Sequence, residues 1–389
     1  MKILALNSGS NSLKYKLINM YTKKTLMTGH IDAIGLDRCE IRIEIGANKI
    51  TKKALVKDHL DAVMMALRSL KQEEVIKSYN EIDAVGHRVV HGGEYYNHAV
   101  LVNQHVINNI KKLSELAPLH NPHNLAGILA CKKIIPHTKQ FAIFDTAFHQ
   151  TIPKYAFMYG IPFEFYVKYG IRKYGFHGTN HKYMSEQAAK LLGKKSHEMI
   201  TCHLGNGSSI TAIKNGKSID TTMGFTPLDG LIMGTRSGDI NPEIPLYLIK
   251  KGHYKIEEIE DILNNKSGLL GITHKSFDVR DIRAMALKGD EKAKLALHML
   301  SYKISFYIGG FSTILGDLDC LVFSGGIGEN AWYIREKVLD SIKHIGVKYD
   351  KTKNKNNDII ISTPDSKVKV FIIPANEELE IAKEVALLL

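Results

Sequence analysis

One local pattern occurs twice, about 200 residues apart, and strongly limits the folds open to this chain. Residues 3–18, "ILALNSGSNSLKYKLI", read as an apolar strand, a turn of small polar residues and a second strand. The alternation of Leu13, Tyr15 and Leu17 with lysines is typical of a half-buried strand. Residues 199–220, "MITCHLGNGSSITAIKNGKSID", repeat the design. The repeat indicates a duplicated domain, although two unrelated hairpins would look the same.

The first turn, residues 7–12, holds six polar residues where a hairpin needs about two. Its hydroxyls, amides and backbone N–H groups suit a phosphate or a hydrated cation. A purely structural polar turn is the competing interpretation. A phosphate-binding P-loop is absent, because the nearest sequence, Gly216-Lys217-Ser218, has Thr211 in place of the first glycine. Three separate glycine and hydroxyl turns, at 7–12, 205–209 and 324–330, instead predict a nucleotide-binding fold of another kind.

Length and composition are those of a globular protein of two or three domains, with 389 residues, 44% hydrophobic and 24% charged. The net charge of +12 fits anionic ligands, and the basic residues are too dispersed to predict a nucleic-acid partner. No apolar run is long enough for a membrane span, so no membrane partner is expected. Four scattered cysteines and the missing export signal predict reduced thiols and a cytoplasmic protein.

Strands and helices alternate along the chain, which predicts an α/β fold. Strands are expected within 79–93, 139–149 and at 320–324, the last followed by a glycine turn and an amphipathic helix. A charged loop is expected at 348–358, and a final helix near Asn376, which is a candidate N-cap. Further helices are expected at 53–70, 104–116, 180–192, 255–264 and 290–314.

Two arginines and one histidine lie in glycine-rich segments and are candidates for chemistry. Arg88 in "GHRVVHGG" and Arg236 in "MGTRSGD" each carry a fork that fits a carboxylate or a phosphate, or else a structural ion pair. His177 in "YGFHGTNH" is either a catalytic or a structural histidine. No histidine has the spacing of a zinc-binding helix.

With these segments in view, the chain resembles the acetate kinase family of the acetate and sugar kinase, Hsp70 and actin superfamily. The resemblance rests on two long signatures, "ILALNSGSNSLKYKL" and "TTMGFTPLDGLIMGTRSGDINP". Shorter matches run in order from residue 3 to about 382: "GHRVVHGG", "APLHNPHN", "FDTAFH", "YGFHGTNH", "HLGNGSS", "FSGGIGEN" and "IPANEELEIA". Departures from the usual pattern include His123 and Asn241, and neither removes a matched catalytic position.

The resemblance implies two duplicated RNase H-like (actin-like ATPase) domains with an interdomain active-site cleft. Residues 1–149 plus 376–389 are expected to form one domain, and 150–375 a second that carries most of the nucleotide site. It also implies a homodimer, to which the apolar segment 290–316 would contribute.

The implied reaction is Mg²⁺-dependent, reversible phosphoryl transfer between ATP and acetate, giving ADP and acetyl phosphate, with Mn²⁺ able to substitute. Asn7 and Glu377 match the metal site. Residues matching the nucleotide site are Lys14, His203, Leu204, Gly205, Asn206, Gly207, Asp278, Val279, Arg280, Gly326, Ile327, Gly328, Glu329 and Asn330.

Arg88 matches the carboxylate-binding arginine, and the acyl pocket matches Val90, Leu119, Phe176 and Pro227. The implied catalytic residues are Asp145, His177, Arg236 and His120. An ionised carboxylate needs no strong base, so direct in-line transfer is expected, with a phosphorylated Glu377 or His177 as the alternative.

Three competing interpretations remain. A kinase for propionate or butyrate would share these motifs, because one methylene changes specificity by only about 1–3 kcal/mol. An actin-like or Hsp70-like ATPase would lack the arrangement of Arg88, Arg236 and His177. A nucleic-acid-binding role would rest on the charge alone.

Overall fold

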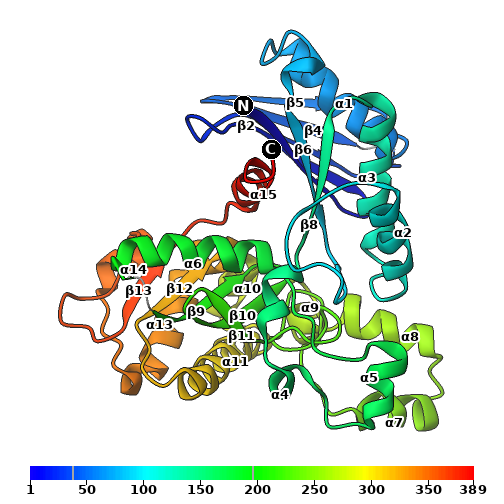
Figure 1. Cartoon of the computed structure of the whole chain (residues 1–389). Coiled ribbons are helices and arrows are strands. Elements are labelled where there is room, and N and C mark those ends of the chain that lie inside the picture. The colour runs from blue at the N-terminus through cyan, green and yellow to red at the C-terminus, as the bar shows by residue number, and fades with distance from the viewer. Residues whose placement is uncertain (37–38, 195–196) are drawn as a thin grey trace. The chain divides into compact units, whose positions relative to one another are not determined.

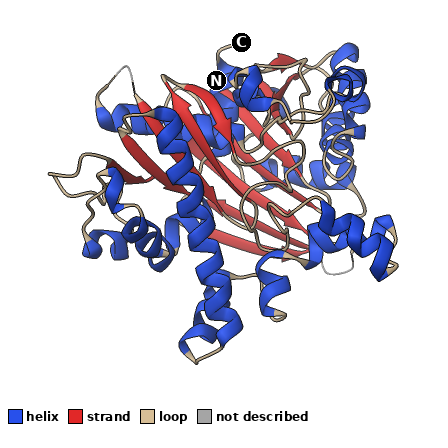
Figure 2. Cartoon of the chain, turned by 90° about the horizontal axis from the view of Figure 1, so that it is seen from below, coloured by secondary structure: helices blue, strands red, loops and turns tan. Residues whose placement is uncertain are grey.

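The computed structural model describes residues 1–36, 39–194 and 197–389, and its contacts divide the chain into two compact units. The first unit comprises Met1–Phe148 and Asn376–Leu389, and the second comprises His149–Ala375. Each unit has its own sheet with helices packed against it, drawn in Figure 1 in sequence colours and in Figure 2 by secondary structure.

The first sheet has eight strands in the order β5-β4-β3-β2-β1-β6-β8-β7. Strands β1 to β5 form an antiparallel meander, and β1, β6 and β8 run parallel. The bounds are β1 Lys2–Ser8, β2 Ser12–Asn19, β3 Lys24–Asp32, β4 Glu40–Ile45, β5 Asn48–Lys53, β6 Ala84–Val89, β7 Val100–Leu101 and β8 Lys139–Phe144. The predicted hairpin at 3–18 is confirmed, with Asn7 opposite Lys14.

Helices cover both faces of this sheet because its central strand is apolar on both sides. Leu4 and Leu6 of β1 face the core under α1 (His59–Gln72) and α3 (Asn121–Ile134). Ile3 and Ala5 face the opposite core, which α15 (Glu377–Ala386) closes. Figure 1 shows this red C-terminal helix beside the blue N-terminal strands. The helix α2 (Gln104–Lys112) packs against α3.

The second sheet has five strands in the order β11-β10-β9-β12-β13. Their bounds are β9 Glu198–Leu204, β10 Ser208–Lys214, β11 Lys217–Thr221, β12 Cys320–Ser324 and β13 Lys369–Ile372. The long helix α11 (Glu291–Leu315) packs on β9 and β10, while α6 (Gly178–Leu192) contacts β9 and β12. The other helices are α4 Lys154–Phe157, α5 Phe163–Tyr169, α7 Glu243–Gly252, α8 Ile256–Asp261, α9 Gly268–Thr273, α10 Val279–Leu287, α12 Gly325–Asn330, α13 Trp332–Ser341 and α14 Lys351–Asn356.

The two sheets share one strand plan. Reading β3-β2-β1-β6-β8 against β11-β10-β9-β12-β13 gives two antiparallel pairings followed by two parallel pairings in each unit. The duplicated RNase H-like, actin-like ATPase fold expected from the sequence is therefore confirmed.

Three local predictions are wrong. Part of the expected loop at 348–358 is the short helix α14, because the Asp350 carboxylate accepts hydrogen bonds from the N–H groups of Thr352 and Lys353. The expected glycine turn at 324–330 is the helix α12, entered through Gly325 at φ +79°. Asn376 precedes α15 but does not cap it, since its side chain accepts a hydrogen bond from Lys16 instead.

Candidate active site

In the first unit, four of the predicted site residues gather where neighbouring strands end. Asn7 lies near the end of β1, Arg88 near the end of β6, and Asp145 directly after β8. Since these strands are adjacent and parallel, their carboxyl ends meet at one edge of the sheet. Glu377 joins them from the start of α15, because this helix returns to the same sheet.

Arg88 is the centre of this group. Its Nε lies 3.1 Å from Asp145 Oδ1 and its Nη2 pairs with Asp145 Oδ2, a two-pronged ion pair. Its Nη1 lies 3.4 Å from Asn7 Oδ1, and its Nε lies 3.6 Å from Glu377 Oε2. Burial lowers the pKa of Arg88, but the charges of Asp145 and Glu377 more than offset this and raise it. Arg88 therefore stays charged and fixed in direction.

Charged groups of both signs surround Glu377. Burial raises the pKa of its carboxyl well above the ordinary value, Asp145 and Glu378 raise it further, and Arg88 opposes them. Lys16 pairs with Glu378 at 3.1 Å and not with Glu377. Lys14, predicted to lie near the nucleotide, is exposed on β2 opposite Asn7 and lowers the Glu377 pKa slightly.

Val90, Leu119 and His120 lie on the segments that follow β6 and precede α3. Val90 is buried, whereas Leu119 is 56% exposed. The amide of Asn124 accepts a hydrogen bond from Val90 N–H at 3.0 Å and donates one to Ser8 C=O at 2.7 Å. Asn124 thereby ties the Val90 segment to the first polar turn. Sequence reasoning passed over this residue, although it stands one helical turn after His120, within a matched motif.

In the second unit, His177 and Arg236 converge on the Gly205–Gly207 turn between β9 and β10. A Cβ built on Gly207 would lie 3.5 Å from His177 Nε2 and 3.6 Å from Arg236 Nη1. His177 holds a left-handed backbone conformation, φ 57°, just before α6. Its ring stacks on His203 with centroids 4.3 Å apart.

Arg236 has no carboxylate partner within ion-pair distance in the part of the chain that the structure describes. Its Nη1 faces the carbonyl oxygen of Pro227 at 3.4 Å and the sulfur of Met233 at 3.7 Å. Burial without a counter-ion lowers its pKa. A half-buried guanidinium of this kind is suited to bind an anion, because the anion would supply the missing charge.

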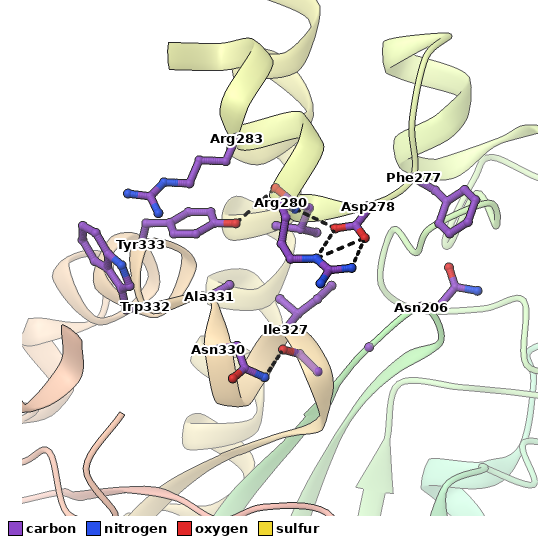
Figure 3. A pocket seen from close by; sticks show the side chains of 13 residues that line it. Asn206, Phe277, Asp278, Arg280, Arg283, Ile327, Asn330, Ala331, Trp332 and Tyr333 are labelled. Atoms are coloured by element: carbon purple, nitrogen blue, oxygen red, sulfur yellow. Dashed lines mark hydrogen bonds and ion pairs between the residues drawn. The ribbon is translucent and has the colours of Figure 1, made fainter. Parts of the chain in front are cut away.

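The same turn forms one wall of a cavity of about 540 Å³ within the second unit. Figure 3 shows its side chains, with Asn206 on one side and Tyr333 and Trp332 on the other. Of the predicted nucleotide residues, eight line it: Gly205, Asn206, Asp278, Val279, Arg280, Gly326, Ile327 and Asn330. Its size is within the range of small-molecule sites.

Other lining residues were missed by sequence reasoning: Phe277, Arg283, Ala331, Trp332 and Tyr333. The Arg283 guanidinium lies 4.2 Å from the Tyr333 ring centre and 4.8 Å from that of Trp332. The adjacent aromatic pair Trp332 and Tyr333, one residue beyond "GIGEN", was the signal that the sequence offered.

Several predicted nucleotide residues lie outside the cavity wall. Leu204 is buried in the core, and His203 stacks on His177. The Glu329 carboxylate accepts hydrogen bonds from the N–H groups of Gly325 and Ala375, both at 2.9 Å. Gly328 packs against the backbone of β9 and β12. These residues shape the turns that carry the cavity.

The predicted acyl-pocket residues fall in both units. Val90 and Leu119 belong to the first, and Phe176 and Pro227 to the second. Phe176 is buried, and its carbonyl oxygen lies 2.9 Å from His149 Nε2.

The donor set of the first unit fits a hard divalent cation. Asn7 Oδ1 and the Glu377 carboxylate are oxygen donors, and both lie beside Arg88. Within residues 1–36, 39–194 and 197–389, no group of three or more His, Cys, Asp or Glu side chains is placed to hold a metal. Mg²⁺ does not need three protein ligands of this kind, because it commonly uses one or two carboxylates together with waters and substrate phosphates.

A duplicated actin-like ATPase fold with a cavity of small-molecule size beside Arg236 and His177 fits a phosphotransferase. A model of the Acetokinase family matches residues 2–383. The acetate kinase of Caldicellulosiruptor saccharolyticus is 52% identical, with all of both chains covered. The chain belongs to the acetokinase family.

Solved structures agree with this assignment. A Porphyromonas gingivalis acetate kinase is 41% identical with a TM-score of 0.94, over 99% of both chains. A Francisella tularensis propionate kinase is 45% identical with a TM-score of 0.94, over 98% of both chains.

Proposed function

We propose that this protein transfers the γ-phosphoryl group of ATP to acetate, reversibly, giving ADP and acetyl phosphate. The observation that carries the proposal is the closeness of Arg236 to His177 Nε2 at Gly207, since Arg236 has no counter-ion among the residues that the structure describes. Gly207 belongs to the turn that lines the nucleotide-sized cavity. Both substrates are anions, so their reaction needs positive charge placed at the transferring group.

The cavity of the second unit would take the nucleotide. Trp332, Tyr333 and Phe277 offer flat surfaces to a base. The Gly205 N–H is donated within its own turn, so the N–H groups of Asn206 and Gly207 would face the phosphates. Asp278 caps α10 and holds Arg280 in an ion pair of 2.5 Å, which fixes the direction of Arg280 at the cavity edge.

Arg88 would bind the acetate carboxylate, with Val90, Leu119, Phe176 and Pro227 receiving the methyl group. The role of Asp145 follows from its contacts. It holds Arg88 through two nitrogen atoms, so it orients the carboxylate-binding arginine and is not needed as a base. His120, at the start of α3, is proposed as a further active-site residue. Transfer would be direct and in line, without a phosphorylated Glu377 or His177.

Asn7 and Glu377 would hold the divalent metal, which we propose is Mg²⁺, with Mn²⁺ able to substitute. When bound, such a metal neutralises phosphate charge and helps to orient the phosphoryl group. Both side chains lie beside Arg88 at the same edge of the first sheet, which supports this assignment.

A homodimer is proposed from the exposed apolar side chains of α11. Leu295, Tyr302, Phe306 and Ile314 are each at least half exposed on this helix, at helical spacing. Light scattering of the purified protein would show the mass of two chains. Because the reaction consumes ATP, we expect it to take place in the cytoplasm. No helix within the described ranges is long and apolar enough to span a membrane.

Propionate is a second candidate substrate, because a structure titled a propionate kinase is 45% identical to this chain. The buried Val90 favours the smallest acid, since a smaller residue there would leave room for a longer chain. Overlap between the acids is expected, as one methylene is worth about 1–3 kcal/mol.

The test is a hydroxamate trap of the acyl phosphate, with ATP, Mg²⁺ and acetate, propionate or butyrate. We expect acetyl phosphate, with the highest kcat/KM for acetate. A higher value for propionate or butyrate would assign the longer acid. ATP hydrolysis that does not depend on any acid would instead support an actin-like ATPase.

A further inference from the structure

Three buried side chains behind His177 form a continuous hydrogen-bonded row. Ser209 Oγ lies 2.9 Å from His177 Nδ1 and 2.7 Å from His181 Nε2. His181 Nδ1 lies 2.7 Å from Thr201 Oγ1. The row joins α6, β10 and β9, and Ser209, His181 and Thr201 are fully buried.

The hydrogens in this row can be counted. Burial, with His149 and His203 nearby, lowers the pKa of His181 far below its ordinary value, so its ring is neutral and carries one hydrogen. Thr201 Oγ1 and Ser209 Oγ carry one hydrogen each. Three contacts therefore share three hydrogens before His177 is considered.

The hydrogen bond of Thr201 determines which atom donates and which accepts in each contact of the row. In the described part of the chain, the Thr201 side chain has one hydrogen-bond partner, His181 Nδ1. A buried hydroxyl that donates to nothing costs about 1–3 kcal/mol, so Thr201 donates and His181 Nδ1 accepts. The single hydrogen of His181 then lies on Nε2 and is donated to Ser209 Oγ.

The direction of the Ser209 hydrogen determines which nitrogen of His177 carries a hydrogen. Among the described residues, the Ser209 side chain has two hydrogen-bond partners, His181 and His177, and the bond with His181 already uses the serine as acceptor. The serine hydrogen therefore points to His177 Nδ1, which accepts it. A neutral His177 with its hydrogen on Nε2 satisfies every group in the row, whereas a hydrogen on Nδ1 would leave the buried serine hydrogen without an acceptor.

We propose that Thr201, His181 and Ser209 are positioning residues that hold His177 as the neutral Nε2–H tautomer, so that it donates a hydrogen bond to the transferring phosphoryl group. This inference rests on the proposed function of His177. Its Nε2 is the ring atom beside Gly207 and Arg236. Arg236 then supplies charge, and His177 supplies a directed donor that needs no proton from solvent.

The tautomer is measurable without any turnover. In protein labelled with ¹⁵N-histidine, long-range ¹H–¹⁵N spectra distinguish Nδ1–H, Nε2–H and charged rings, and the His177→Gln variant assigns the signals of His177. We expect Nε2–H for His177 and His181 in the wild-type enzyme. A hydrogen on Nδ1 of His177, or a charged ring at pH 8, would overturn the proposal whatever reaction the protein catalyses.

Variants of Thr201 test the row at its far end. Thr201→Val removes the hydroxyl with little change in shape, and we expect mixed tautomers at His181 and His177. Thr201→Ser keeps the hydroxyl and should restore the wild-type spectrum. Thr211→Val is the matched control, because Thr211 is equally buried on β10 but bonds Thr221 at 2.8 Å and does not contact His177.

Kinetics give an independent reading. Ser209→Ala should lower kcat about 10- to 100-fold, less than the ~10⁴-fold loss caused by a wrong histidine tautomer in a serine protease triad. KM for acetate should stay within about twofold, since Ser209 contacts neither arginine. Thr201→Ser and Thr211→Val should keep wild-type kcat. Wild-type spectra and kcat in both Ser209→Ala and Thr201→Val would refute the row. A wild-type enzyme without kinase activity would refute the proposed function and leave the spectra to decide the tautomer.

Discussion

The two units share one strand plan, but their key arginines differ in their carboxylate partners. Arg88, at the edge of the first sheet, is held by Asp145 and approached by Glu377. Arg236, beside the β9–β10 turn of the second unit, has no carboxylate partner among the described residues. The two units therefore share a strand plan without sharing the same arrangement of charges around the arginine.

The contrast suggests a division of work. In the first unit, carboxylates outnumber Arg88, which suits a metal and a fixed carboxylate clamp. The second unit offers an arginine that lacks a counter-ion, a histidine and glycine backbone beside a cavity, which suits a nucleotide and its phosphates. Four predictions test this contrast.

The largest effect is expected for Arg236→Ala. An arginine that stabilises a transferring phosphoryl group is worth about 10³–10⁵ in rate, so kcat should fall in that range. Since Arg236 pairs with no carboxylate in the described ranges, the melting temperature should stay near the wild-type value. The hydroxamate assay and thermal denaturation check the two halves. A large loss of stability with little loss of kcat would give Arg236 a structural role and remove the contrast.

Arg88→Ala should damage both activity and stability. We expect kcat/KM for acetate to fall about 10²- to 10³-fold with the loss of the carboxylate fork. Breaking this buried ion pair removes the two-pronged contact that Arg88 makes with Asp145 and costs about 3–5 kcal/mol of unfolding free energy. The double variant Arg88→Ala/Asp145→Asn should recover much of the stability and none of the activity. If denaturant titrations showed no recovery, the ion pair would not be the source of the loss.

Gly207→Ala should act on the second unit alone. The added methyl group would lie 3.4 Å from His177 Cε1 and 3.6 Å from Arg236 Nη1, which the fold accommodates. It would occupy space that the proposal gives to a phosphoryl group, so kcat should fall about 10- to 100-fold. Gly160→Ala is the control, because a Cβ at Gly160 meets nothing within 4 Å. Equal kcat in both variants would move the phosphoryl site away from Gly207.

Acid should destabilise the protein through neutral buried histidines, an effect smaller than the loss of Arg88. Burial lowers the pKa of His87 in the first unit and of His149 in the second to about 4. A folded pKa below the unfolded value of about 6.5 gives stability that is present above pH 6.5 and lost as pH falls toward 4. Each such histidine should cost about 2 kcal/mol at pH 5.

His87→Gln tests this effect, with the exposed His137→Gln as its control. Urea titrations at pH 7 and pH 5 should show a smaller loss in His87→Gln than in the wild type. The same loss in both would mean that His87 is already charged in the folded protein.

Contiguous motifs carried most of the site that the sequence predicted. Arg88, His177 and the Gly205–Gly207 turn each lie within one conspicuous segment, so local reading found them. Contacts across elements were hidden. The row behind His177 draws Thr201, His181 and Ser209 from three elements, and its existence depends on the β9–β10 register and the packing of α6. The fold was predictable because each of the two similar hairpins forms the first two strands of its unit along the chain.

Local composition gave wrong predictions at two short helices. The segment at 351–356 is too polar for periodicity to reveal α14, which depends on the Asp350 cap. The glycines of α12 predict a turn and not a helix. In the sequence, Trp332 and Tyr333 therefore look like the start of an ordinary helix, whereas in the structure they form the aromatic side of the cavity.

The division of work is tested most directly by calorimetric titration of ADP into the wild type, Trp332→Ala and Arg88→Ala. Loss of a stacked ring costs about 1–3 kcal/mol per base, so the Kd for ADP should rise about 5- to 150-fold in Trp332→Ala. In Arg88→Ala it should stay within about threefold of the wild type, because Arg88 does not line the cavity. An unchanged Kd in Trp332→Ala, or a large rise only in Arg88→Ala, would contradict the assignment of the nucleotide to the second unit.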